Sequence, residues 1–158
     1  MVKYIAEVEL DDLDRAILAL LQVNCRISNA ELSRRVNLSP PAVHARIRRL
    51  EDAGLITDYV ALLDRESVGF DMLCFVQIGL QLHQADQVEG VRTAFLALPE
   101  VLECFHVTGE FDYLLKVVVR NRKDLEQFIG HITPVPGIAR IQTSLVLNDV
   151  KAVTQLPI

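Results

Sequence analysis

The stretch that decides the fold runs from Ser28 to Leu50 and reads SNAELSRRVNLSPPAVHARIRRL. Its first four residues match a capping box, in which the Ser28 hydroxyl accepts a backbone N–H and the Glu31 side chain reaches back to the helix start. Asn37 ends the run that follows, and asparagine tolerates the left-handed conformation that a helix end requires. The pattern predicts a short helix between Ser28 and Asn37.

A second helix is predicted directly after this turn. Ser39 is an N-cap residue, and Pro40 follows in the first turn, where its missing N–H costs nothing. Val43, Ile47 and Leu50 then repeat at spacings of four and three, which places them on one apolar face. The stretch therefore predicts two helices joined by a tight turn.

The other face of the second helix is basic. Between Leu32 and Leu50 the chain has five arginines and no acidic residue. Small residues near the start of a helix and cations towards its end suit a helix that enters the major groove of DNA. Solvated helix pairs with arginines also form the corners of many α-helical domains, but the combined pattern favours DNA binding. The residues expected to meet DNA are Ser28, Asn29, Ser39, Pro41, Ala42, His44, Ala45, Arg46, Arg48 and Arg49.

The acidic charge of the chain is concentrated away from this basic stretch. The 158 residues carry a formal net charge of −5, and the acids gather in the C-terminal half and at the N-terminal edge. Because the helix pair alone is basic, we expect one oriented DNA contact and weak binding elsewhere. The acids at the N-terminal edge are Glu7, Glu9, Asp11, Asp12 and Asp14.

Composition disfavours several other classes of protein. The apolar runs are short and interrupted, and the N-terminus lacks the basic-then-apolar pattern of a signal sequence, so we expect a cytoplasmic protein. Cys25, Cys74 and Cys104 have no metal-ligand spacing and are expected to be reduced. The four histidines are scattered, and no nucleophile has an evident base. We therefore expect no catalytic residue, no metal and no cofactor.

The predicted secondary structure changes near residue 65. Before it the pattern is helical: Asp11 caps a first helix, and Gly54 closes the third. Residues 55–63 alternate enough for a strand or an extended connector. We therefore expect a winged-helix-like helix-turn-helix domain over residues 1–64. The inner face of its first helix consists of Leu13, Ile17, Leu20 and Leu21.

After residue 65 the predicted order is strand-helix-strand-strand-helix-strand. This is the ferredoxin-like βαββαβ arrangement, in which two helices cover one face of a four-stranded sheet. The fold class is therefore predicted to be α+β, with a second domain over residues 65–158. The expected strands are Leu73–Leu82, Val101–Thr108, Tyr113–Val119 and Ile138–Leu147, and the expected helices are Ala85–Leu98 and Asp124–Ile132.

The second face of this sheet has no helix to cover it. Leu73, Phe75, Leu114 and Val118 are among the residues available to that face. Exposed apolar area on this scale marks an interface. We therefore expect a homodimer formed through the second domain, which would also set two helix pairs against two DNA half-sites.

Gly109–Asp112 connects two of the predicted strands. From the residues alone a plain hairpin connection is favoured, in which glycine supplies a positive φ and Asp112 bonds its own backbone.

Motifs spread over essentially the whole chain are together highly specific. They are Leu13-Asp14, Ile17-Leu18, Arg26–Ser33, Val36–Pro40, Val43–Glu51, Gly54–Ile56, Tyr59, Thr108–Lys116 and Val135–Ile138. On these motifs the chain resembles the Lrp/AsnC (leucine-responsive regulatory protein) family, the feast/famine transcription regulators. The resemblance implies an N-terminal helix-turn-helix that binds double-stranded DNA, a C-terminal amino-acid-sensing domain, and dimers that commonly build octamers.

The resemblance also gives the Gly109–Asp112 segment a second interpretation, as the loop that binds a free amino acid between neighbouring dimers. Asp112 or Glu110 would hold the α-ammonium group. The N–H groups of the turn at Gly109, beside Thr108, would hold the α-carboxylate. Thr133 aligns approximately with a family position that faces the same pocket.

Three positions depart from the family pattern. Cys25 and Asp58 stand where the family usually has glycine, and Asn37 replaces a common glycine between the two helices. If Cys25 must adopt a positive φ, it carries strain of about 1 kcal/mol.

Two other functions stay open on the sequence. Siroheme decarboxylases share the two-domain architecture, although an intact arginine-bearing helix argues against an enzyme. An effector-independent architectural protein would have the same DNA-binding helices without a response to any amino acid.

Overall fold

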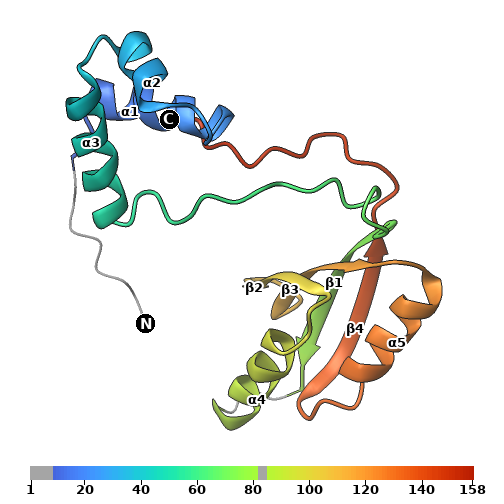
Figure 1. Cartoon of the computed structure of the whole chain (residues 1–158). Helices are drawn as coiled ribbons and strands as arrows, with labels where there is room; N and C mark the ends of the chain where they lie inside the picture. Colours follow the sequence, from blue (N-terminus) through green and yellow to red (C-terminus); the bar gives the residue numbers. More distant parts are fainter. Residues whose placement is uncertain (1–8, 82–84) are drawn as a thin grey trace. The chain divides into compact units, whose positions relative to one another are not determined.

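The computed structural model describes residues 9–81 and 85–158 and divides the chain into two compact units. The helical unit comprises the chain up to Leu62 together with Lys151–Ile158, and the sheet unit comprises Leu63–Val150 (Figure 1). The sequence suggested a boundary at residue 64 and a second domain that continues to the C-terminus. The final residues instead pack with the helical unit, because Gln22 hydrogen-bonds the backbone of Leu156.

The helical unit contains α1 (Asp12–Val23), α2 (Asn29–Val36) and α3 (Pro40–Asp52). The cap predicted at Asp11 is confirmed, and it forms a full capping box with Asp14. The backbone N–H of Asp14 donates to Asp11 Oδ1 at 2.8 Å, and the N–H of Asp11 donates to Asp14 Oδ2 at 3.2 Å. Two of the N–H groups that a helix start leaves without intrahelical partners are thereby satisfied.

The capping box predicted at the start of α2 is only half formed. Ser28 Oγ accepts the N–H of Glu31 at 3.2 Å, as expected. The Glu31 carboxylate, however, pairs with the guanidinium groups one turn further along, Arg34 and Arg35, the latter at 2.9 Å. The hydrogen bond from Arg35 and the charge of Arg34 lower the pKa of Glu31. The expectation that Glu31 reaches back to the helix start is therefore wrong.

The turn between α2 and α3 follows the sequence prediction. Asn37 ends α2 in the left-handed conformation, with φ 52° and ψ 47°. Ser39 caps α3 by accepting the N–H of Ala42 at 3.4 Å, and Gly54, with φ +72°, follows the end of that helix. In the described part of the chain Cys25 is not among the residues with positive φ, so it does not carry the strain considered above.

Each helix buries one apolar face in a shared core. Ile17 of α1, Leu32 and Val36 of α2, and Val43 and Ile47 of α3 form this cluster. Complete burial of such a side chain contributes about 1.5–3 kcal/mol relative to exposure. The cluster fixes the rotation of α3 about its own axis, and the opposite face of α3 is exposed to solvent.

The sheet unit has the expected ferredoxin-like order. Its four strands pair antiparallel in the order β2-β3-β1-β4, and α4 and α5 cover one face (Figure 1). The first strand was expected to reach Leu82, but residues 82–84 lie outside the described residues, and the strand ends at Leu80. The elements are β1 (Met72–Leu80), α4 (Ala85–Leu96), β2 (Val101–His106), β3 (Tyr113–Val119), α5 (Arg122–Ile132) and β4 (Ile138–Leu145).

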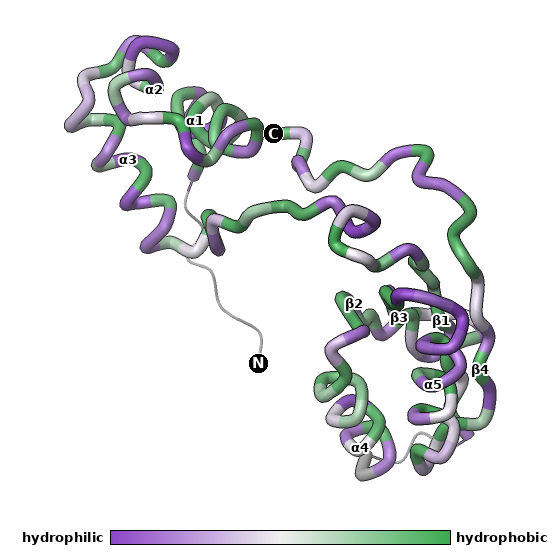
Figure 2. The backbone as a smooth tube through the Cα atoms, turned by 45° about the vertical axis from the view of Figure 1, so that its right-hand side comes forward, coloured by the Kyte–Doolittle hydropathy of each residue, from purple (hydrophilic) through white to green (hydrophobic). Residues whose placement is uncertain are grey.

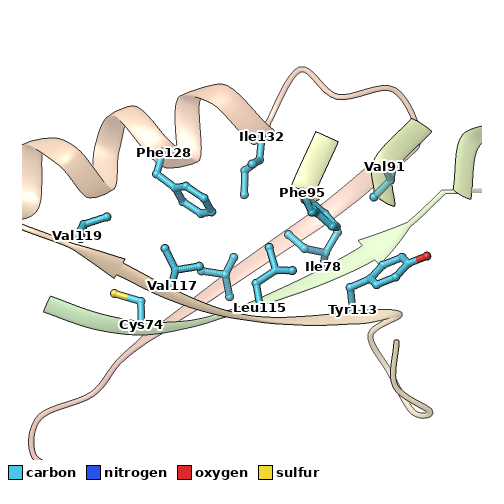
Figure 3. Packing of buried hydrophobic residues seen from close by; sticks show 11 residues of the cluster. Cys74, Ile78, Val91, Phe95, Tyr113, Leu115, Val117, Val119, Phe128 and Ile132 are labelled. Atoms are coloured by element: carbon cyan, nitrogen blue, oxygen red, sulfur yellow. The ribbon is translucent and has the colours of Figure 1, made fainter. Parts of the chain in front are cut away.

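Alternate residues of the central strands pack against the two helices (Figure 3). Ile78 of β1 lies opposite Tyr113 of β3. The ring of Phe95 from α4 meets Tyr113 edge-on, with ring centroids 5.7 Å apart, and Phe128 supplies the corresponding ring from α5. The period-two burial of β1 and β3 therefore reflects one face filled by helices.

The other face of the sheet carries the apolar side chains that the sequence suggested, together with polar ones such as Gln77 and Lys116. Leu73 and Val118 are only 8% and 6% exposed, because neighbouring side chains already cover them. Phe75 and Leu114 are partly exposed, and Phe105, opposite Leu114 on β2, is 46% exposed. An apolar strip therefore remains in contact with solvent on this face.

Residues 57–64 form an extended connector without strand pairing. The connector carries a hydrophobic run, visible in Figure 2, and the side chains of Val60, Leu62 and Leu63 are largely exposed. Within the described residues, no helix has the length and apolar character needed to cross a membrane.

Candidate nucleic-acid interface and loop site

The outer face of α3 presents the side chains that the sequence assigned to DNA. Pro41, His44, Ala45 and Arg49 are exposed. The Arg48 side chain is 74% exposed and makes one ion pair, at 4.0 Å, with Asp52, which is itself 75% exposed. A pair at that distance in water contributes little, so the guanidinium group of Arg48 is available to a ligand.

The remaining assigned residues have structural partners of their own. Ser28 and Ser39 use their hydroxyls to cap α2 and α3, and Asn29 is the first residue of α2. Ala42 is half-buried in the first turn of α3. The N-terminal ends of both helices therefore bring Ser28, Asn29 and Ser39 to the surface, and helix N-termini attract phosphate.

A buried carboxylate on α1 holds two of the three C-terminal arginines of α3. The Asp14 side chain has no exposed surface. Arg46 Nη1 donates to Asp14 Oδ1 at 2.8 Å and to Asp11 Oδ2 at 2.6 Å, and Arg49 Nη2 forms a second ion pair with Asp14 Oδ2. Arg46 is therefore an anchor between helices. Arg49, with 48% of its side chain exposed, is anchored at one edge and open at the other.

The charges of this cluster reinforce one another. The N–H of Asp14 and the guanidinium group of Arg46 lower the pKa of Asp11 below its usual value of 3.8. A carboxyl group with a lowered folded-state pKa stabilises the fold fully above its unfolded-state pKa and loses that contribution as the pH falls through the lower value. The contact between α1 and α3 is therefore intact at neutral pH.

The second predicted site, the loop Thr108–Asp112, is fastened to β1 by its last residue. The N–H of Asp112 donates to the carbonyl of Ile78 at 2.9 Å, and Asp112 Oδ2 accepts the N–H of Leu80 at 2.7 Å. Gly109 has φ +123°, a conformation that favours glycine. The Asp112 carboxylate thus fastens the turn to the neighbouring strand, whereas the plain hairpin interpretation expected it to bond its own backbone.

Glu110 is held by a residue that the sequence analysis missed. Arg140 Nη1 donates to Glu110 Oε1 at 2.9 Å, and Nη2 donates to the Glu110 carbonyl at 3.2 Å. The guanidinium carbon lies 4.2 Å from the ring centroid of Phe111, a cation–π contact. Arg140 therefore grips the loop at two successive residues.

A weak signal for Arg140 is present in the sequence. Gly79 interrupts a mostly apolar strand, and a glycine inside a strand often marks a close approach of another chain segment. It lies opposite Arg140 across the β1–β4 pair, and a Cβ added there would stand 3.5 Å from the Arg140 Cβ. Because the glycine has no side chain, the arginine side chain has room on this side of the strand. The sequence does not say which residue fills that space.

Thr133, the last predicted effector residue, forms the C-cap of α5. Its hydroxyl donates to the carbonyl of Ile129 at 2.7 Å. Thr108, Gly109 and Glu110 are exposed. The exposed Glu110 carboxylate therefore lies next to a glycine turn, and its described partner is Arg140.

Family models match both units. A model described as a winged helix-turn-helix DNA-binding domain matches residues 10–57, and the model of the Lrp/AsnC ligand-binding domain matches residues 73–156.

Named relatives agree with these matches. The chain is 41% identical over 151 residues to the leucine-responsive regulatory protein of Escherichia coli K12, with 95% of this chain and 92% of the relative covered. It is 37% identical over 150 residues to the DNA-binding transcriptional activator DecR of the same organism, with 94% and 99% covered.

Solved structures share the fold over nearly the full length. A Neisseria meningitidis transcriptional regulator in complex with L-methionine superposes with a TM-score of 0.91 and 38% identity, covering 94% of this chain and 97% of that one. Escherichia coli AsnC superposes with a TM-score of 0.87 and 29% identity, covering 94% and 99%.

The buried carboxylate gives a first prediction. We expect Asp14→Asn to lower the free energy of unfolding by about 2 kcal/mol, since Arg46 and Arg49 lose their shared charge but recover part of their hydration. Urea unfolding followed by far-UV circular dichroism measures the change. Asp12→Asn is the matched control, because Asp12 is exposed in the same first turn. Equal stability of the two variants would contradict an anchoring role for Asp14.

Proposed function

Since the chain belongs to the Lrp/AsnC family of DNA-binding transcriptional regulators, we propose that α3 reads operator DNA and that a free amino acid bound at Thr108–Asp112 modulates this binding. The observation that carries the proposal is the outer face of α3: a basic, solvent-exposed surface on a helix whose other face and two of whose arginines are fixed to the helical core.

The DNA contact is proposed to have two parts, one made by the N-terminal ends of α2 and α3 and one made by the exposed side of α3. The N-terminal ends of α2 and α3, with Ser28, Asn29 and Ser39, suit phosphate contacts. The exposed side of α3 suits base contacts, and Arg48 is the arginine with the greatest freedom to make them. Arg46 would act by holding the angle between α1 and α3. A regulator of chromosomal DNA would work in the cytoplasm.

The effector proposal rests on chemistry and on a neighbour. The Neisseria meningitidis regulator was crystallised with L-methionine, and its fold covers nearly the whole of this chain. Glu110 is the carboxylate proposed for the α-ammonium group, because the Asp112 carboxylate already binds the N–H of Leu80. The turn at Gly109, beside Thr108, is proposed for the α-carboxylate, and Thr133 for the far end of the ligand.

The two alternatives are weaker. The named relatives are transcriptional regulators, which favours regulation over a siroheme-decarboxylase-like enzyme. An architectural DNA-binding protein would share α3, but it would need no exposed carboxylate beside a glycine turn. A response of DNA affinity to an amino acid separates the regulator from the architectural protein.

We also propose that two chains associate through the apolar sheet face and that the dimers build an octamer. Phe75, Leu114 and Phe105 line the part of that face that stays exposed. Burial of apolar area in a two-fold interface stabilises the dimer and sets two α3 helices against two half-sites.

DNA affinity should separate the arginines of α3. With DNA selected from a random pool by the wild-type chain, Arg48→Ala should weaken binding by about 1–3 kcal/mol and leave the stability unchanged, if Arg48 contacts a base edge. Arg49→Ala should weaken binding and also lower the stability, because it breaks the pair with Asp14. Titrations at several salt concentrations distinguish base contacts from phosphate contacts, since the loss of a phosphate contact reduces the salt slope. Wild-type affinity of the double variant at about 0.15 M salt would overturn the assignment.

An amino-acid effector should stabilise the chain. A ligand present at 100 times its dissociation constant adds about 2.7 kcal/mol, so a thermal-shift screen of the common amino acids, L-methionine and L-leucine included, should find it.

Glu110→Gln should weaken the binding of that amino acid about tenfold, because charge-assisted hydrogen bonds are roughly twice as strong as neutral ones. Glu126→Gln, on the exposed surface of α5, is the control. Calorimetry with Asp112→Asn should show reduced thermal stability and a smaller loss of affinity. Undiminished binding by Glu110→Gln would move the search to the Thr133 end.

The dimer proposal predicts a change of mass. Leu114→Glu places a charge in the exposed strip of the sheet face, and burial of an unpaired charge is costly, so the variant should sediment as a smaller species than the wild type. Leu96→Glu introduces the same charge at an 82% exposed position on α4 and should leave the assembly unchanged. Sedimentation velocity at micromolar concentration compares them, and an unaltered assembly of Leu114→Glu would refute the interface.

A further inference from the structure

The last residues of the chain bind the helical unit as an extended peptide would. The amide group of Gln22, in the last turn of α1, accepts the N–H of Leu156 at 2.6 Å and donates to the Leu156 carbonyl at 3.1 Å. This two-way contact reads the backbone of residue 156 and not its side chain, which is 69% exposed. Pro157 follows, and a residue before proline is held in extended conformations, so Leu156 is preset for the contact.

A third hydrogen bond links this segment to the end of α1. Gln155 Nε2 donates to the carbonyl of Gln22 at 3.3 Å. The final carbonyls of a helix have no intrahelical partner, and the last turn of α1 has no basic residue to satisfy them. The C-terminal segment therefore adds to the cap that α1 has from Asn24, whose N–H donates to the carbonyl of Leu20 at 3.0 Å.

The segment borders an apolar cavity in the same unit. The cavity has a volume of about 650 Å³ and is lined by the end of α1, by Ile56 and Tyr59 of the connector, and by Leu156 and Ile158. Both segments that link the two units thus meet at the end of α1. The exposed apolar side chains beside the cavity give the segment a surface on which to pack.

The same two segments are tied together where they leave the sheet unit. Arg65 Nη1 donates to the carbonyls of Phe70 and Asp71, and Nη2 lies 3.5 Å from Asp149 Oδ2. The sequence passes from β4 through Asp149 directly into the C-terminal segment. β4 is also an edge strand, paired to β1 alone within the described sheet, and it carries Arg140.

We infer that residues 151–158 are a second tether, docked on α1, through which the state of the Thr108–Asp112 loop reaches the DNA-binding helices. The inference rests on the proposed function. An α-ammonium group that binds Glu110 competes with the guanidinium group of Arg140 for the same carboxylate. Release of Arg140 alters the edge strand that leads into the tether.

The docking itself is tested in the full-length chain without any effector. Amide hydrogen exchange followed by NMR should show the N–H of Leu156 protected, because Gln22 accepts it. Gln22→Ala should lower this protection about tenfold, which corresponds to the loss of the Gln22 hydrogen bonds. Gln127→Ala, on the exposed surface of α5, should not change it. An unprotected Leu156 amide in the wild-type chain would overturn the inference.

The coupling is tested with a matched pair at one position. Leu156→Pro removes the N–H that Gln22 accepts, whereas Leu156→Ala keeps it and trims an exposed side chain. With L-methionine and L-leucine as probes, the alanine variant should show the wild-type change in operator affinity. The proline variant should bind the amino acid as the wild type does and lose that change.

The outcomes separate the tether from the proposed function. A wild-type response in the proline variant would overturn the tether. If neither amino acid alters the operator affinity of the wild-type chain, the effector proposal fails for these ligands. Hydrogen exchange of the Leu156 amide then decides whether the segment docks on α1. If Leu156→Pro also loses amino-acid binding in calorimetry, the segment belongs to the loop site and the tether is overturned.

Discussion

The helical unit depends on one buried carboxylate. Asp14 begins as half of a capping box and ends as the shared partner of Arg46 and Arg49, so one side chain starts α1 and fixes α3 against it. A charge without exposed surface is tolerated when paired charges and hydrogen bonds compensate its lost hydration, and here two guanidinium groups do so. The apolar core sets which face of α3 turns outward. The ion pairs of Asp14 with Arg46 and Arg49 set the angle between α3 and α1.

The parts of the fold that local signals specify were predictable from the sequence. Caps at Asp11 and Ser39, the left-handed Asn37 and period-two strands such as Tyr113–Val119 depend on neighbours along the chain. The contacts that shape the sites do not. Arg49 meets Asp14 across 35 positions, Arg140 meets Glu110 across 30, and Gln22 meets Leu156 across 134. No period or motif connects residues that far apart, so those pairings emerge only from the folded chain.

The same limit divides the candidate sites. The basic face of α3 follows from helical spacing, but spacing treats Arg46, Arg48 and Arg49 alike, and it is the distant Asp14 that distinguishes them. In the loop, residue type alone suggested two equivalent carboxylates. Register makes them different, because Asp112 is bonded to the backbone of β1 and Glu110 to a side chain of β4.

The position of the C-terminal segment has a consequence for biosynthesis. The helical unit is built from both ends of the chain, so its first helices emerge from the ribosome long before the residues that cap α1. Domains generally fold as units during synthesis, N-terminal first. This unit stays unfinished, with the apolar surface at the end of α1 uncovered, until residues 151–158 have been synthesised. A chain released before residue 151 therefore exposes that apolar surface. Chaperones and proteases act on such incompletely folded proteins.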